Sequence, residues 1–180
     1  MQRSRFMVIL LAAGLGLLLW GWARRLFGIA AAGTVLALFV FEPNLMAHGS
    51  LATTDMGLTF FFMLTTWFLR RVWLRIDFDS LGGLSLFFAL AQVSKFSAVV
   101  LWPAVATVLL LRALGSSPWE VGLGGRCRSL PRRDHKAVAA VCVMLALGVV
   151  FLGVVWGAYG FRHAIAPEPG LTADFTEDRE

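Results

Sequence analysis

The residues best suited to chemistry lie within residues 41–62, FEPNLMAHGSLATTDMGLTFFF, between two apolar runs. This stretch holds the densest cluster of hydrogen-bonding side chains in the chain: Glu42, Asn44, His48, Ser50, Thr53, Thr54 and Asp55. Desolvating such groups at the edge of a membrane is costly unless they are used. We therefore take this stretch as the candidate functional region.

His48 and Asp55 are seven residues apart, which on a continuous helix places them on nearly one face, two turns from each other. Asp55 could act as a general acid or base or as a cation ligand, but Thr53, Thr54 and Asp55 before an apolar run also form a signal for a helix start. His48 could bind a divalent metal with Asp55 or Glu42, bind a phosphate or sugar, or make an ordinary polar contact. These alternatives stay open.

Two cations could complete such a site. Lys95 lies where two short apolar segments meet, and Arg162 lies just after Tyr159. Each could extend to lipid headgroups or neutralise the phosphate of a lipid-linked substrate. If both face one cavity with Asp55, the site has an acid and two phosphate-binding cations, as transfer from a phospholipid carrier requires. The candidate supporting residues are Glu42, Asn44, Thr54 and Tyr159, with Asn44 also suited to a turn after Pro43.

The composition indicates an integral membrane protein. Hydrophobic residues make up 58% of the 180 residues and charged residues 15%, with a mean hydropathy of +0.76. The net charge is +5, but the basic residues lie mainly in short loops between apolar runs, which favours membrane topology over nucleic-acid binding. The two cysteines, Cys127 and Cys142, are too few and too differently placed for a disulfide framework or a metal site.

The apolar runs predict an all-α protein, a polytopic bundle of about six transmembrane helices. They cover residues 6–22, 27–41, 56–69, 81–93, 96–111 and 137–159. Only the last exceeds the roughly 20 residues that cross a hydrocarbon core, so shorter helices must rely on neighbouring helices or local thinning of the bilayer. We expect a membrane domain over residues 1–166 and a polar outer loop or tail over residues 167–180.

The basic residues predict the orientation. Residues 23–25, 70–80 and 112–136 hold eleven of the sixteen: Arg24, Arg25, Arg70, Arg71, Arg75, Arg112, Arg126, Arg128, Arg132, Arg133 and Lys136. The positive-inside rule makes these loops cytoplasmic and places residues 42–55 and both chain ends outside. An N-terminus that reads MQRSR and lies outside suggests that a preceding helix is missing, so we expect the chain to be a fragment.

Several segments carry a family resemblance: RRLFG, EPNLMAHGSLATTDMGLTFFF, GLSLFFALAQVSKFSAVVLWP and WGAYGFR. Together they resemble the phospholipid-carrier-dependent glycosyltransferases of the GT-C superfamily, which includes protein O-mannosyltransferases and lipid A aminoarabinose transferases. The resemblance spans residues 24–162. It implies an enzyme that moves a sugar, with inversion, from a polyprenyl- or dolichyl-phosphate donor to a protein or a glycolipid or glycan acceptor on the outer face.

The resemblance also implies site residues. His48 and Asp55 match an outer-loop motif, Lys95 the lysine between paired helices, and Tyr159 and Arg162 the aromatic-basic end of a later helix. A divalent metal takes part in some family members. The first helix and outer loop, with the principal catalytic acid, would precede Met1, so we expect this chain to be inactive by itself. A bacterial inner membrane is the expected location.

Two other functions stay open at this stage. A small transporter or flippase subunit would need polar residues deep inside several helices, whereas Thr65, Thr66 and Gln92 are few and uncharged. A non-catalytic membrane partner of a transferase would share the resemblance and lack the activity.

Overall fold

The structure is a computed structural model that describes residues 2–43, 54–123, 126–158 and 160. Within these residues the chain forms six α-helices and a short 3-10 helix, η1 (Phe96–Val100), that leads directly into α6. The α-helices are α1 (Gln2–Phe27), α2 (Ile29–Phe41), α4 (Thr54–Leu74), α5 (Phe78–Ser94), α6 (Leu101–Leu114) and α7 (Arg133–Ala158).

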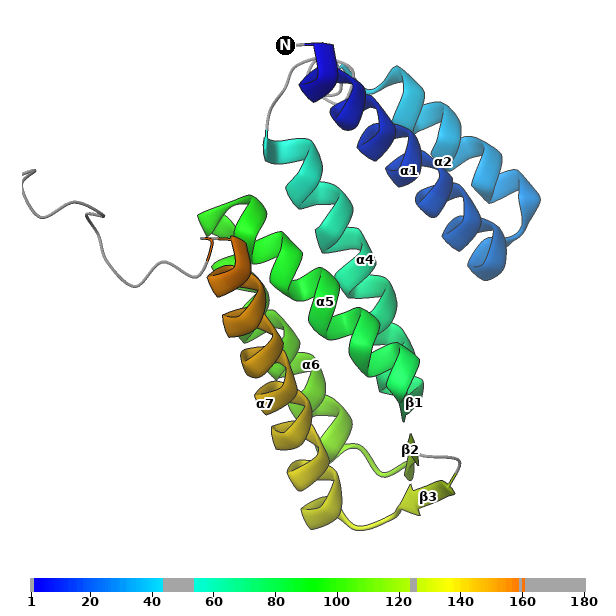
Figure 1. Cartoon of the computed structure of the whole chain (residues 1–180). Helices are drawn as coiled ribbons and strands as arrows, with labels where there is room; N and C mark the ends of the chain where they lie inside the picture. Colours follow the sequence, from blue (N-terminus) through cyan, green and yellow to red (C-terminus); the bar gives the residue numbers. More distant parts are fainter. Residues whose placement is uncertain (1, 44–53, 124–125, 159, 161–180) are drawn as a thin grey trace, which may run out of the picture.

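The helices run up and down beside one another (Figure 1). Helix α1 packs on α2 and α4, α4 packs on α5, and α7 packs on both α5 and α6. The turn from α1 to α2 is tight because Gly28 adopts a positive φ of 90°, a conformation that glycine reaches without strain. The Gly28 amide donates to the Arg24 carbonyl over 3.1 Å, which closes the end of α1.

The six predicted helices are confirmed, but several are longer than their apolar runs. Helix α1 has 26 residues, α4 has 21 and α7 has 26, because helical structure continues into the charged residues at the ends. In the part of the chain that the structure describes, three helical segments are long and apolar enough to cross a membrane: Phe6–Phe27, Phe96–Leu114 and Arg133–Ala158. Helices α2 and α5 are shorter apolar helices. The protein is therefore a multi-pass membrane protein, and a full set of six crossings stays a prediction.

The all-α prediction is confirmed for the bundle, and a small β-sheet that the sequence did not predict lies at one end of it. Strand β1 (Arg75–Asp77) pairs in parallel with β2 (Trp119–Leu123), which pairs antiparallel with β3 (Arg126–Leu130). The sequence predicts loops over residues 70–80 and 112–136. Strands of three and five residues without a strong apolar alternation leave little signal in a sequence, and their pairing joins segments far apart in the chain.

The sheet passes directly into α5 through a capping box. The Ser80 amide donates to the Asp77 carboxylate over 2.7 Å, and the Asp77 amide donates to the Ser80 hydroxyl over 3.0 Å. The Ser80 amide hydrogen bond is the main reason that the pKa of Asp77 lies below its ordinary value, with smaller contributions from the Ser80 hydroxyl, Arg71 and Arg75. Helix α5 therefore has a sharply fixed start.

Arg112 ties the sheet to the helix ends. Its guanidinium donates to the carbonyls of Trp73 (2.8 Å), Ser117 (3.1 Å) and Pro118 (2.8 Å), and the residue is 6% exposed. The indole of Trp119 is also buried and donates to the Val72 carbonyl over 2.9 Å. Arg112 is thus a buried structural cation, not a loop charge at the membrane surface as the sequence suggested.

Lys136 makes a similar connection at the start of α7. It is fully buried, and its ammonium donates to the carbonyls of Gly115 and Ser117. Ser117 therefore receives hydrogen bonds from both buried cations, which join the end of α6 to the start of α7. At least two of the eleven loop cations satisfy backbone carbonyls inside the protein.

We expect Arg112→Met to lower the free energy of unfolding by about 2 to 4 kcal/mol, because it leaves several buried carbonyls without their donor. Thermal or denaturant unfolding in detergent, followed by tryptophan fluorescence, measures this loss. Arg132→Met is the matched control, because Arg132 is exposed at the same end of the bundle and undergoes the same change of side chain. Equal stability of the two variants would contradict the structural role of Arg112.

Candidate functional site

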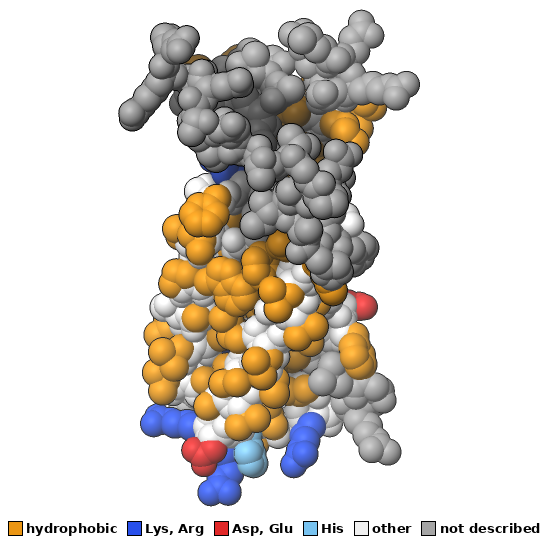
Figure 2. Space-filling model, turned by 60° about the vertical axis from the view of Figure 1, so that its left-hand side comes forward, with side chains coloured by type: hydrophobic (Ala, Val, Ile, Leu, Met, Phe, Trp, Pro, Cys, Tyr) orange, Lys and Arg blue, Asp and Glu red, His pale blue; other side chains and the backbone are white. Residues whose placement is uncertain are grey.

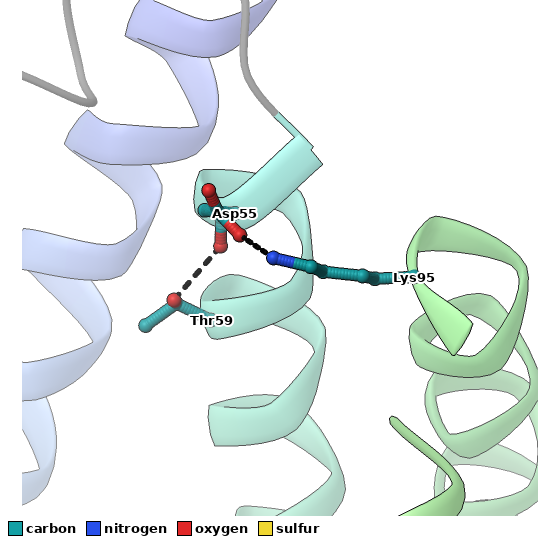
Figure 3. A network of polar contacts seen from close by, with 3 residues as sticks. All are labelled: Asp55, Thr59 and Lys95. Atoms are coloured by element: carbon teal, nitrogen blue, oxygen red, sulfur yellow. Dashed lines mark hydrogen bonds and ion pairs between the residues drawn. The ribbon is translucent and has the colours of Figure 1, made fainter. Parts of the chain in front are cut away.

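Asp55 lies in the first turn of α4, which begins at Thr54. A carboxylate there interacts favourably with the positive end of the helix dipole. The Thr59 hydroxyl donates to the Asp55 backbone carbonyl over 2.8 Å, one turn further along the helix (Figure 3). The prediction of Asp55 at a helix start is confirmed. The position leaves its carboxylate at the end of the bundle, where it can interact with other elements.

Lys95 lies at the break between α5 and η1. Its backbone is extended, with φ −159° and ψ 137°, so the helical path is interrupted at this single residue. Its amide still donates to the Ala91 carbonyl over 3.3 Å, and its carbonyl accepts from the Ala98 amide over 3.0 Å. Both neighbouring helices are therefore capped by the Lys95 backbone, and the side chain extends from the junction toward α4 (Figure 3).

The structure brings Asp55 and Lys95 together. The Lys95 ammonium donates to Oδ1 of Asp55, which forms an ion pair between residues forty positions apart (Figure 3). The two side chains are 43% and 41% exposed. An ion pair this open contributes only about 0 to 1 kcal/mol to stability. Its groups are therefore accessible to a ligand, and stability alone gives little reason for the pairing.

The other predicted site residues are only partly described. Glu42 directly follows α2 as its C-terminal cap, and Thr54 begins α4. Four predicted residues lie outside the described part of the chain: Asn44, His48, Tyr159 and Arg162. Their places in the site stay predictions.

A divalent-metal site at Asp55 finds no support in the described residues. In that part of the chain, no group of three or more His, Cys, Asp or Glu side chains is arranged to hold a metal ion. The Lys95 ammonium already supplies positive charge beside the Asp55 carboxylate. His48, the other expected ligand, lies outside the described residues, so a metal site at Asp55 stays a prediction.

An apolar pocket that no sequence pattern predicts begins at the residues on either side of Lys95, although neither member of the ion pair lines it. It has a volume of about 620 Å³ and is formed by the end of α5, η1, α6 and the end of α7. Phe96 lines it, directly follows Lys95 and is 88% exposed. Gln92 also lines it, with its amide satisfied by the Ala98 carbonyl over 2.9 Å. Apolar pocket residues cannot be told from lipid-facing ones in a sequence, since both are simply hydrophobic.

The two ends of the bundle differ in charge. Figure 2 shows hydrophobic side chains over the middle of one face and Lys and Arg side chains gathered at its lower end, where α7 begins. The start of α4 and the end of α5, which carry Asp55 and Lys95, lie at the opposite end (Figure 1). The ion pair is therefore remote from the main concentration of basic residues.

A family model, dolichyl-phosphate-mannose-protein mannosyltransferase, matches residues 1–121. The chain belongs to this family. The match confirms the resemblance to GT-C glycosyltransferases and includes both Asp55 and Lys95. Helix α7, Tyr159 and Arg162 lie beyond the matched residues of this mannosyltransferase-family chain. Comparison with curated proteins and with solved structures gives no match.

The exposure of the ion pair predicts a small coupling energy between Asp55 and Lys95. In a double-mutant cycle of Asp55→Asn and Lys95→Met, we expect a coupling of at most about 1 kcal/mol in the free energy of unfolding. Denaturant unfolding of the four proteins in one detergent measures it. A coupling of several kcal/mol would mean that the pair exists chiefly to hold α4 against α5.

Proposed function

We propose that this protein is a membrane glycosyltransferase that moves a sugar from a polyprenyl- or dolichyl-phosphate donor to a protein or a glycolipid or glycan acceptor. Family membership supports the reaction class. The observation that carries the proposal for the site is the accessible Asp55–Lys95 pair. It provides a carboxylate and a cation at one end of the bundle, as transfer from a lipid phosphate requires.

The reaction takes place at the extracytoplasmic face. The basic residues of the α1–α2, α4–α5 and α6–α7 connections support a cytoplasmic location for that end of the bundle. Asp55 and Lys95 lie at the opposite end (Figure 1). A lipid-linked sugar displayed on the outer leaflet reaches this end without crossing the hydrocarbon core.

Lys95 binds the donor phosphate and stabilises the leaving group. As the bond between the sugar C1 and the phosphate oxygen breaks, negative charge grows on the lipid phosphate, and an ammonium nearby offsets it. Two unit charges 4 Å apart interact by about 4 kcal/mol at an effective dielectric constant of about 20. Arg162 is the second cation in this proposal.

Asp55 positions Lys95 and accepts a hydrogen bond from a sugar or acceptor hydroxyl. When a phosphate binds, the Lys95 ammonium interacts with two anions, and Asp55 keeps it on the side facing α4. The acceptor oxygen then forms a bond to C1, the phosphate leaves with the electron pair of the broken bond, and a carboxylate base takes the acceptor proton. His48 lies seven residues before Asp55 and belongs to the same proposed site.

The apolar pocket beside Lys95 holds the first isoprene units of the carrier. Its lining of Phe96, Val99, Trp102, Phe151 and Val155 suits a branched hydrocarbon chain. The pocket includes Phe96, the residue after Lys95, and so lies at the same end of the bundle as the ammonium. In this proposal one ligand engages the pocket and the cation together.

We expect Lys95→Met to reduce sugar transfer about 100-fold or more, as is typical when one charge-stabilising group is removed from a transition state. Lys95→Arg keeps the charge and should retain more activity. Asp55→Asn should also lower turnover while membrane insertion stays intact. The assay follows radiolabelled mannose from dolichyl- or undecaprenyl-phosphate mannose into protein or lipid, in source membranes that contain the protein at its native length.

Arg132→Met is the control for charge removal at the opposite end, and it should transfer sugar at the wild-type rate. Wild-type turnover by Lys95→Met would remove Lys95 from the mechanism. An absence of transfer by the wild-type protein in its own membrane, together with stable co-purification of another transferase, would overturn the proposal and favour a non-catalytic membrane partner.

A further inference from the structure

A second pocket lies at the basic end of the bundle, between the end of α1 and the last turns of α4. It has a volume of about 220 Å³ and is lined by Trp22, Arg25, Leu26, Trp67, Arg70 and Arg71. Arg70 lies fifteen residues after Asp55 on the same helix, which corresponds to about 22 Å along its axis. The pocket is therefore separate from the candidate glycosyl-transfer site.

Three arginines surround this small pocket without a carboxylate partner. Arg25, Arg70 and Arg71 are exposed, and across residues 2–43, 54–123 and 126–158 no carboxylate forms an ion pair with them. Arg71 acts on one acidic group at longer range, since it helps to lower the pKa of Asp77. Three guanidinium groups around one pocket repel one another, so an anion that enters the pocket is attracted and offsets this repulsion.

Aromatic rings hold two of these cations in place. The Arg25 guanidinium lies over the Trp67 ring, 5.3 Å from its centroid, and the Arg71 guanidinium lies 5.7 Å from the centroid of Phe68. Trp67 in turn packs edge-to-face against Trp22, with 5.5 Å between the ring centroids. The cations are therefore partly ordered before any ligand binds, which reduces the entropy lost on binding.

The Trp22 indole contributes its ring to the wall of the pocket. Its Nε1 atom is buried and has no hydrogen-bond partner among the described residues. Because this atom is closed off from the pocket, the donors that a ligand meets there are the guanidinium groups of the three arginines.

We propose that this pocket binds the phosphate of an anionic phospholipid headgroup. Guanidinium groups match phosphate oxygens through paired N–H donors, and three of them surround this pocket. Basic pockets between transmembrane helices on the cytoplasmic side are suited to such headgroups. Lipid is favoured over free phosphate because α1 is a candidate membrane span whose Leu17 and Phe27 are exposed to the surroundings of the protein.

The bound headgroup would join α1 to α4. These two helices supply all six lining residues, and Arg25 of α1 already contacts Trp67 of α4. A phosphate held by Arg25 on one side and Arg70 and Arg71 on the other therefore stabilises this helix pair. The proposal does not depend on sugar transfer, since no residue of the pocket belongs to the site around Asp55.

The test titrates the purified full chain, in a neutral detergent, with phosphatidylglycerol, phosphatidylcholine or inorganic phosphate. Native mass spectrometry counts bound lipid, and thermal unfolding reports stabilisation. We expect phosphatidylglycerol to bind and to raise the unfolding temperature, with at least tenfold weaker binding of phosphatidylcholine and no effect of inorganic phosphate at the same concentration. Equal stabilisation by inorganic phosphate would overturn the lipid assignment, and equal binding of both lipids would overturn the preference for an anionic headgroup.

Variants locate the site. We expect Arg25→Gln/Arg70→Gln to weaken phosphatidylglycerol binding at least tenfold. The matched control is Arg132→Gln/Arg133→Gln, which removes the same charge from exposed arginines at the start of α7. An equal loss of phosphatidylglycerol binding in the control would show that the lipid is attracted to the basic end as a whole. That result would overturn the assignment of the lipid to this pocket. Circular dichroism of each variant confirms that the helices are intact.

Discussion

The hydrogen bonds that Arg112 donates to backbone carbonyls fix the basic end of the bundle, and the rest of the structure depends on them. They join the end of α4, the end of α6 and the segment that leads into β2. Lys136 adds the start of α7 through Gly115 and Ser117. Helix ends leave carbonyls without intrahelical partners, and a buried cation with several donors satisfies them at once.

This fixed end determines what the opposite end can do. Helix α5 starts at a capping box and packs along α4, so the register between the two helices is set well before they reach Asp55 and Lys95. The ion pair does not have to provide that register. Because the pair is exposed and adds little stability, its charges can be redistributed toward a ligand phosphate without loosening the bundle.

The sequence predicted the helices because long apolar runs have few alternatives in a membrane protein. The residue types of Asp55 and Lys95 marked them as site candidates, but their contact depends on the packing of α4 on α5, which no spacing in the sequence reveals.

Arg112 and Lys136 are buried, although the sequence predicted surface charges, because a count of charges contains no information about burial. The strands were missed because β1 pairs with β2 across the whole α5–α6 segment. Trp22 and Arg25 belong to a pocket only once α1 lies against α4.

The length of α5 links the site to the membrane surface. Its 17 residues rise by about 26 Å, which is less than the roughly 30 Å of a hydrocarbon core. If α5 crosses the bilayer, Asp77 and Lys95 cannot both reach water without local thinning or extension of the lysine side chain. Lys95 then lies at the boundary between hydrocarbon and headgroups, where the phosphate of a polyprenyl carrier also lies.

The lower dielectric constant at this boundary strengthens the attraction between the Lys95 ammonium and a phosphate relative to bulk water. A short helix thus provides a physical reason for a lysine at this position to recognise a lipid phosphate in preference to a soluble one.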